Sequence, residues 1–203
     1  ILINGGMVQT RAGKIISELT LPESVTRKAI EICDVRYKDL VIYIGDGIYF
    51  KKMNGNIFPV YGHLTSGLNA VGEWAAIEEM FPRANKCLVV DCFEPMNLLE
   101  MGNVFDDAFK GEVDVLHTST VLVELMPKGI NKVTGIRTLA ESMGISLDAI
   151  TAFGDYDNDV EMLSSVGLGV AVENASPSAK AAADIVIGSV DEQGPALFLK
   201  ELL

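Results

Sequence analysis

The run Phe153-Gly154-Asp155-Tyr156-Asp157-Asn158-Asp159 places three carboxylates and one amide within seven residues. Like charges this close repel one another unless a cation neutralises them. Hard oxygen ligands of this kind suit magnesium, so the run predicts a site for Mg²⁺. The alternative, which the run leaves open, is an acidic turn in which an aspartate caps the next helix.

Two other ligand-binding motifs fit the chain poorly. Counted from Asp155, the sixth position of a calcium-binding EF-hand loop is Val160 instead of glycine, and the twelfth is Val166 instead of glutamate. Gly167-Leu168-Gly169 lacks the third glycine of a dinucleotide-binding fingerprint, and its glycines precede a strand.

Lys132, in Gly129-Ile130-Asn131-Lys132, begins a predicted helix that follows a predicted strand at Val121–Leu125. A lysine in this position can reach over the edge of a sheet and offset the charge of a phosphate, as cations do in phosphoryl transfer. The alternative is a solvated surface lysine, which is the commoner fate of a lone lysine.

Two asparagines are further candidates for the same sheet edge. Asn174 follows the predicted strand in Val170-Ala171-Val172, where it either lines the edge or caps the next helix, and capping is the favoured role. Asn4, in Asn4-Gly5-Gly6, is equally open, because Asn-Gly also forms plain turns.

The part of the chain that carries the acidic run alternates between helices and strands. We expect helices at 131–143, 158–164, 177–183 and 195–203, and strands at 149–153, 167–172 and 184–187. This alternation predicts a parallel sheet covered by helices. The acidic run then lies at the carboxyl end of a strand, where open α/β sheets bind ligands.

Strand pairs dominate the earlier part of the chain. We expect a hairpin within 7–19 and another within 41–50, strands at 86–90 and 113–117, helices at 22–33, 73–80 and 94–109, and a loop at 54–69. The sequence therefore predicts two modules. An α/β core comprises residues 1–19 and 119–203, and an inserted α+β domain comprises residues 20–118.

The composition bears on which molecules the protein could bind and on the cellular compartment in which it works. The formal net charge of −12 argues against nucleic acid as a partner. Three cysteines (Cys33, Cys87 and Cys92) form no Cys-x-x-Cys pair and predict reduced thiols. We find no signal peptide and no apolar run of membrane-spanning length, and we expect a cytoplasmic protein.

The order Asn131-Lys132, then Gly154–Asp159, then Val172-Glu173-Asn174-Ala175 resembles the C-terminal half of Cof-type phosphatases of the haloacid-dehalogenase-like (HAD) superfamily. Asn4-Gly5-Gly6 is similar to the Asn-Gly-Ala turn that precedes the cap of that family. The resemblance implies an α/β, HAD-like Rossmannoid core with an inserted α+β cap at 20–118, which closes over the substrate and sets specificity.

The resemblance also implies roles for single residues. Asp155 would bind Mg²⁺ with support from Asp159, and Lys132 would hold the phosphate or an aspartyl-phosphate. Asn158 would contact phosphate, and Asn4 and Asn174 would line the same site. The activity implied is magnesium-dependent hydrolysis of small phosphorylated metabolites such as sugar phosphates.

The family's nucleophile motif, Asp-x-Asp-Gly-Thr, does not occur in residues 1–203. Asp91 follows an apolar run but lacks the second aspartate, and Ile1-Leu2-Ile3 reads as the end of a buried strand. We therefore expect the nucleophile and the N-terminal strands to precede Ile1, in a protein longer by roughly 60 residues or more. Without that segment we expect no activity.

Two other functions stay open at this point. The chain could be a truncated relative that binds a phosphorylated ligand without turning it over, or a sugar-phosphate mutase on the same scaffold. Neither the substrate nor the oligomeric state is predicted by the sequence.

Overall fold

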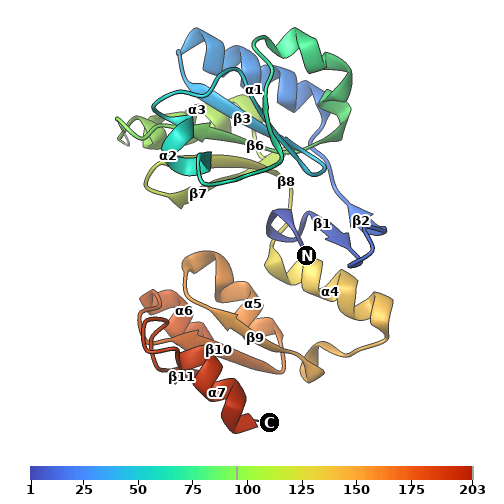
Figure 1. Cartoon of the computed structure of the whole chain (residues 1–203), viewed down its shortest axis with the longest axis vertical. Coiled ribbons are helices and arrows are strands. Elements are labelled where there is room, and N and C mark those ends of the chain that lie inside the picture. Colours follow the sequence, from blue (N-terminus) through green and yellow to red (C-terminus); the bar gives the residue numbers. More distant parts are fainter. Residues whose placement is uncertain (95, 203) are drawn as a thin grey trace. The chain divides into compact units, whose positions relative to one another are not determined.

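The structure is a computed structural model, and it describes residues 1–94 and 96–202. The chain divides into two compact units, and each is described by itself (Figure 1). The first unit comprises Ile1–Ser17 and the chain from Asn131 onward, and the second unit comprises Glu18–Ile130. None of the helices in the described part of the chain is long and apolar enough to cross a membrane.

The first unit is built on a parallel sheet in the order β11-β10-β9, as the alternation of helices and strands predicted. Helices α5 and α6 pack on this sheet through Leu163, Ala171 and Ala179, and α7 packs beside β11. Its elements are η1 (Ile3–Gly5), β1 (Met7–Gln9), β2 (Ile15–Glu18), α4 (Lys132–Met143), η3 (Leu147–Ala149), β9 (Thr151–Gly154), η4 (Asp157–Asp159), α5 (Val160–Ser165), β10 (Leu168–Val172), α6 (Pro177–Ala182), β11 (Ile185–Ile187) and α7 (Gly194–Leu202).

The second unit is a six-stranded sheet in the order β5-β4-β3-β6-β8-β7, in which only β4 and β5 pair in parallel. Helices α1 and α3 pack against its strands (Figure 1). Its elements are α1 (Glu23–Val35), β3 (Asp39–Ile44), β4 (Gly47–Phe50), α2 (Ile57–Tyr61), β5 (Leu68–Ala70), η2 (Trp74–Arg83), β6 (Ala84–Val90), α3 (Met96–Phe109), β7 (Val113–Ser119) and β8 (Leu122–Pro127).

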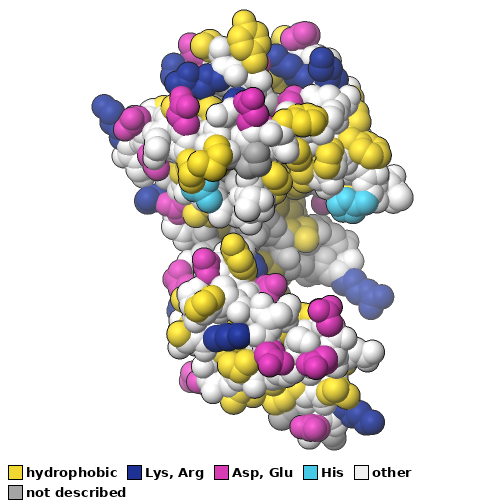
Figure 2. Space-filling model, turned by 90° about the vertical axis from the view of Figure 1, so that its left-hand side faces the viewer, with side chains coloured by type: hydrophobic (Ala, Val, Ile, Leu, Met, Phe, Trp, Pro, Cys, Tyr) yellow, Lys and Arg dark blue, Asp and Glu magenta, His cyan; other side chains and the backbone are white. Residues whose placement is uncertain are grey.

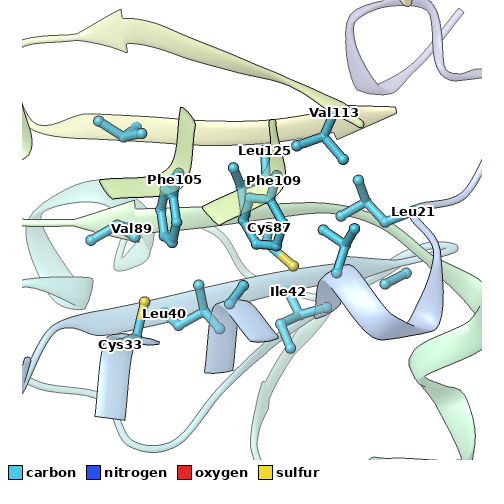
Figure 3. Close-up of a cluster of buried hydrophobic side chains, with 14 of the residues drawn as sticks. Leu21, Cys33, Leu40, Ile42, Cys87, Val89, Phe105, Phe109, Val113 and Leu125 are labelled. Atoms are coloured by element: carbon cyan, nitrogen blue, oxygen red, sulfur yellow. The ribbon is translucent and has the colours of Figure 1, made fainter. Parts of the chain in front are cut away.

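Strand β6 lies at the centre of the second unit, and every one of its residues is buried. Alternate side chains of the strand enter two apolar clusters, with Cys87 and Val89 in one and Leu88 and Val90 in the other. Burial on both faces explains why this strand reads as an apolar run instead of an alternating pattern. Figure 3 shows side chains of the first cluster, among them Phe105, Leu125 and Val89.

The segment predicted as a loop at 54–69 contains a helix, α2, and the first residues of β5. The Asn54 side chain explains this helix: its oxygen accepts the backbone N–H groups of Asn56 and Ile57, at 2.9 and 3.0 Å. Its amide nitrogen donates to Asp39 at 2.8 Å. The loop prediction was wrong here because a short helix can rest on side-chain capping, which leaves little apolar periodicity.

Two further predictions of local structure differ from the fold. The helix predicted at 73–80 is a 3₁₀ helix, η2, whose backbone departs from helical angles at Ile77 (φ −128°). Residues Ile1–Ile3 do not form a buried strand: Ile1 and Leu2 are exposed, Leu2 bridges Met7, and Ile3 begins η1.

The predicted start of the second core segment at residue 119 also differs from the structure. Strand β8 pairs with β6 and β7, so it belongs to the sheet of the second unit, and the first unit resumes at Asn131. The strand predicted at Val121–Leu125 therefore lies before Lys132 in the sequence but is not a strand of the parallel sheet. A strand pattern alone does not say which sheet the strand joins.

The core of the second unit gives a test of its packing. Phe105 is 0% exposed and its ring centroid lies 5.8 Å from that of Phe109. We expect Phe105→Ala to lower the free energy of unfolding by about 3–5 kcal/mol, because a buried ring is replaced by a cavity. Leu99→Ala, on the exposed side of the same helix, should change it by less than about 1 kcal/mol. Urea unfolding followed by circular dichroism makes the comparison, and equal losses would contradict it.

Candidate active site

The three carboxylates of the acidic run have different surroundings. The backbone leaves β9 at Gly154, turns through η4 and enters α5. Asp159 is buried, at 2% exposure, whereas Asp155 and Asp157 are exposed. In the described residues no three acidic, histidine or cysteine side chains are grouped so that they could hold a metal ion. The run is therefore not a cluster of three converging ligands.

Asp159 is held by donors on both of its carboxylate oxygens. Lys132 Nζ lies 2.5 Å from Oδ1, and Oδ2 accepts the backbone N–H groups of Asp155 and Tyr156 at 3.0 and 3.3 Å. Burial opposes ionisation of this group, but the hydrogen bonds from Lys132 and from the two N–H groups outweigh burial. The pKa of Asp159 is therefore lowered from its ordinary value, and the group stays ionised.

Gly154 makes room for this buried carboxylate. A Cβ atom at Gly154 would lie 2.6 Å from Asp159 Cβ and 3.0 Å from its Cγ. Only a residue without a side chain lets the loop fold so closely over the end of β9.

Asp157 faces a different partner. Its Oδ1 accepts the Ser176 hydroxyl at 2.8 Å and the Ser178 hydroxyl as well, and these two bonds lower the pKa of Asp157. The backbone N–H of Ser176 also donates to the Asp155 carbonyl at 2.9 Å. Asp157 thus joins the loop after β9 to the loop after β10. Its Oδ1 already accepts two hydroxyl hydrogen bonds.

Asp155 is the carboxylate of the run that best fits a magnesium ligand. Its side chain is exposed at the carboxyl end of β9, and no hydrogen bond found among residues 1–94 and 96–202 uses its carboxylate. Mg²⁺ usually keeps several waters and takes one or two protein carboxylates together with substrate phosphate oxygens. One free carboxylate fits that requirement, while both oxygens of Asp159 already accept hydrogen bonds.

Lys132 is the first residue of α4, directly after a capping box. The Asn131 side chain accepts the Thr134 N–H at 2.9 Å, and the Thr134 hydroxyl oxygen accepts the Asn131 N–H at 3.2 Å. The helix ends at Gly144 in the left-handed conformation, so the predicted helix over 131–143 is confirmed. A helix start favours anions and disfavours cations, so the Asp159 carboxylate offsets the cost of Lys132 in this position.

Two glycines bring Asn4 beside Lys132. A Cβ atom at Gly5 would lie 2.0 Å from the Asn131 carbonyl oxygen, and one at Gly135 would lie 2.7 Å from Gly5 Cα. Because neither side chain exists, η1 packs directly on the first turn of α4. Asn4 and Lys132 then line one hollow of about 430 Å³ together with Met162 and Ile136.

The two remaining candidates, Asn158 and Asn174, have different surroundings. Asn158 is exposed in η4, between Asp157 and Asp159. Asn174 does not cap α6, so the favoured capping role was wrong: Ser176 is the cap, and Asn174 Oδ1 accepts the Val190 N–H at 3.2 Å. The loops carrying both residues meet at the carboxyl edge of the parallel sheet, since Gly154 lies opposite Ala171 in the register of β9 and β10.

Sequence reasoning missed Gly135, Asn131 and Ser176 as parts of the site. A signal existed for Gly135, since a glycine inside a helix costs about 1 kcal/mol relative to alanine and so indicates a close packing contact. The two caps could be read from Asn131 at the start of one expected helix and Ser176 just before another.

Asp91, considered as a substitute nucleophile, is buried and forms an ion pair with the partly exposed Lys38 in the second unit. Its Oδ2 lies 2.7 Å from Lys38 Nζ, and its Oδ1 accepts the N–H groups of Phe93 and Glu94. Burial opposes ionisation of Asp91, but Lys38 and the N–H groups outweigh it and lower its pKa. Asp91 therefore shapes the loop before α3 and presents no free carboxylate oxygen to a substrate.

The chain also matches a known protein family. The family model for haloacid dehalogenase-like hydrolases matches residues 1–199 of the sequence. The chain belongs to this family. A HAD/COF-like hydrolase from Plasmodium vivax has the same fold, with a TM-score of 0.83 and 25% identity over 98% of this chain and 70% of that chain. The resemblance to the Cof-type branch is thereby confirmed.

Two curated relatives of the chain are phosphatases. It is 27% identical to the HMP-PP phosphatase of Yersinia pseudotuberculosis over 98% of this chain and 72% of that protein. It is 39% identical to the 5-amino-6-(5-phospho-D-ribitylamino)uracil phosphatase YitU of Bacillus subtilis over 39% of this chain and 30% of that protein. Several other curated relatives are matched over less than half of their own length, between 16% and 49%.

The contact between Gly5 and Gly135 gives a test with an internal control. We expect Gly135→Ala to destabilise the protein by about 1–3 kcal/mol, because the new methyl group meets backbone and Ile1 at 2.7 Å. Gly102 is also inside a helix, but a Cβ atom there meets only the exposed His117 ring, which can move. Gly102→Ala should therefore be neutral or stabilising by up to about 1 kcal/mol. Thermal unfolding of both variants decides, and the same sign for both would contradict the packing argument.

The lowered pKa of Asp159 predicts a pH dependence of stability. A carboxyl group whose pKa is lower in the folded state stabilises that state above its unfolded pKa of about 3.9, and the stabilisation is lost as the pH falls through the folded pKa. We expect Asp159→Asn to be less stable than the parent near neutral pH, with the difference shrinking below about pH 4. Urea unfolding across that range measures it, and a pH-independent difference would speak against the ion pair.

Proposed function

We propose that the protein is a magnesium-dependent phosphomonoester hydrolase of small phosphorylated metabolites, acting at the carboxyl edge of β9. The observation that carries the proposal is the buried Asp159 carboxylate, which binds Lys132 Nζ on one oxygen and the Asp155 backbone on the other. Asp159 therefore joins the Lys132 amine to the backbone of Asp155, and Lys132 lines a hollow that Asn4 also lines.

In this proposal Lys132 binds the phosphoryl group. Lys132 lines the hollow at the start of α4, where the dipole of the helix also favours an anion. An arriving phosphate oxygen shares the amine with Asp159, which stays ionised and keeps the lysine in place. Asn158 and Asn4 contribute side-chain amides that can donate to phosphate oxygens.

Asp155 is the residue we assign to Mg²⁺. A bound Mg²⁺ would neutralise negative charge on the phosphoryl oxygens as it builds up during transfer. Asp159 orders the loop that presents Asp155, so its support of the metal is indirect, through the backbone N–H groups that it accepts.

We further propose that the second unit acts as the cap that sets substrate specificity. The names of two relatives, HMP-PP phosphatase and 5-amino-6-(5-phospho-D-ribitylamino)uracil phosphatase, support a small phosphorylated substrate. The proposal assigns phosphate and metal binding to residues of the first unit, and it assigns no nucleophile within residues 1–203.

The test is hydrolysis of p-nitrophenyl phosphate by the full gene product. We expect Mg²⁺-dependent release of p-nitrophenol that EDTA abolishes. Asp155→Ala and Lys132→Met should each lower kcat/KM by about 10²–10³-fold, because each removes a charge that stabilises the transferring group. Asp191→Ala, which removes an exposed carboxylate of the same unit, is the control and should retain activity. Phosphate binding without turnover, or equal rates in Asp155→Ala and the parent, would refute the proposal.

A further inference from the structure

A second polar contact runs alongside the Lys132–Asp159 pair. The Asn131 side-chain nitrogen donates to Glu161 Oε2 at 2.6 Å. Asn131 directly precedes Lys132, and Glu161 is two residues beyond Asp159. Two bonds of different kinds thus join the same two segments, the start of α4 and the start of α5.

The Asn131 side chain is bonded at both of its ends. Its oxygen caps α4 by accepting the Thr134 N–H at 2.9 Å, while its nitrogen is committed to Glu161. The position of the cap, and with it the first residue of α4, therefore depends on where Glu161 lies on α5. Lys132 extends from the first residue of α4, so a shift of the helix start moves the point from which its amine must reach Asp159.

Glu161 itself is outside the candidate site. Its side chain is exposed in the first turn of α5 and does not line the hollow formed by Asn4, Lys132 and Met162. A carboxylate in that turn is favoured by the helix dipole, which explains why it is tolerated there but not why it is bonded to Asn131.

We propose that Glu161 is a positioning residue: by holding the Asn131 side chain, it aligns the start of α4 so that the Lys132 amine meets Asp159 and a bound phosphate. This inference rests on the proposed phosphatase function for its kinetic consequence. Its structural part, the alignment of Lys132 by Glu161, is independent of turnover.

Exchanging the donor and the acceptor tests the bond directly in the full gene product. Asn131→Asp keeps an oxygen to cap α4 but loses the donor and sets two carboxylates face to face. We expect kcat/KM for p-nitrophenyl phosphate to fall about tenfold or more, with most of the loss in kcat, since small misplacements of a site residue are costly. Glu161→Gln alone keeps an acceptor and should stay within about threefold of the parent.

The double variant Asn131→Asp/Glu161→Gln restores the bond with its direction reversed, because the glutamine amide donates to the new carboxylate. We expect its kcat/KM to return to within about threefold of the parent, which is the coupling that a direct contact produces. Glu141→Ala removes an exposed carboxylate from α4 that takes no part in the bond, and it should behave as the parent. A double variant as slow as Asn131→Asp would overturn the proposal.

A readout without turnover separates this inference from the proposed function. The rate of acetylation of the Lys132 amine by acetic anhydride, followed by peptide mass spectrometry, should rise in Asn131→Asp and return to the parent value in the double variant. If the parent itself fails to hydrolyse the substrate, the proposed function is wrong and the labelling alone decides. An unchanged labelling rate in Asn131→Asp would refute the positioning role even if the parent is active.

Discussion

The candidate site depends on one ion pair, between the buried carboxylate of Asp159 and the partly exposed Lys132. A carboxylate that is 2% exposed is costly unless its charge is compensated, and here one lysine and two backbone N–H groups compensate it. The same three donors come from the start of α4 and from the loop after β9. Neutralising one buried charge therefore fixes the relative positions of the cation and the exposed Asp155, and Gly154 supplies the space in which this happens.

The acidic run illustrates why composition is a poor guide to coordination. Read as a list, Asp155, Asp157 and Asp159 look like three equivalent ligands. In the structure one is exposed and accepts no hydrogen bond found in the described chain, one accepts serine hydroxyls from the loop after β10, and one is buried against Lys132. The acidic side chains elsewhere are spread over the face seen in Figure 2, in keeping with the net charge of −12. Partners, more than spacing, set the role of each carboxylate.

Much of the fold could be predicted from the sequence because local signals and burial agree. The helix at Lys132–Met143 has a cap, an apolar face and a terminal glycine, and the strands at β9, β10 and β11 follow from regular alternation with helices. The predictions that failed involve contacts between residues that are distant in sequence. Nothing local in Val121–Leu125 indicates that it pairs with β6 and β7. The short helix α2 is capped by Asn54, whose side chain is held in turn by Asp39, which is distant in sequence.

The first unit is discontinuous, and its two parts meet at the contact between Gly5 and Gly135. Every candidate site residue lies in that unit. The second unit, Glu18–Ile130, is inserted between Ser17 and Asn131. The entropy of closing a flexible loop between two fixed ends grows only with the logarithm of its length, by about 0.6 kcal/mol for each doubling. An insertion at this place can therefore be lengthened, shortened or replaced at small thermodynamic cost. Under the proposed function, the unit proposed to choose the substrate can diverge while the residues proposed to bind phosphate stay as they are.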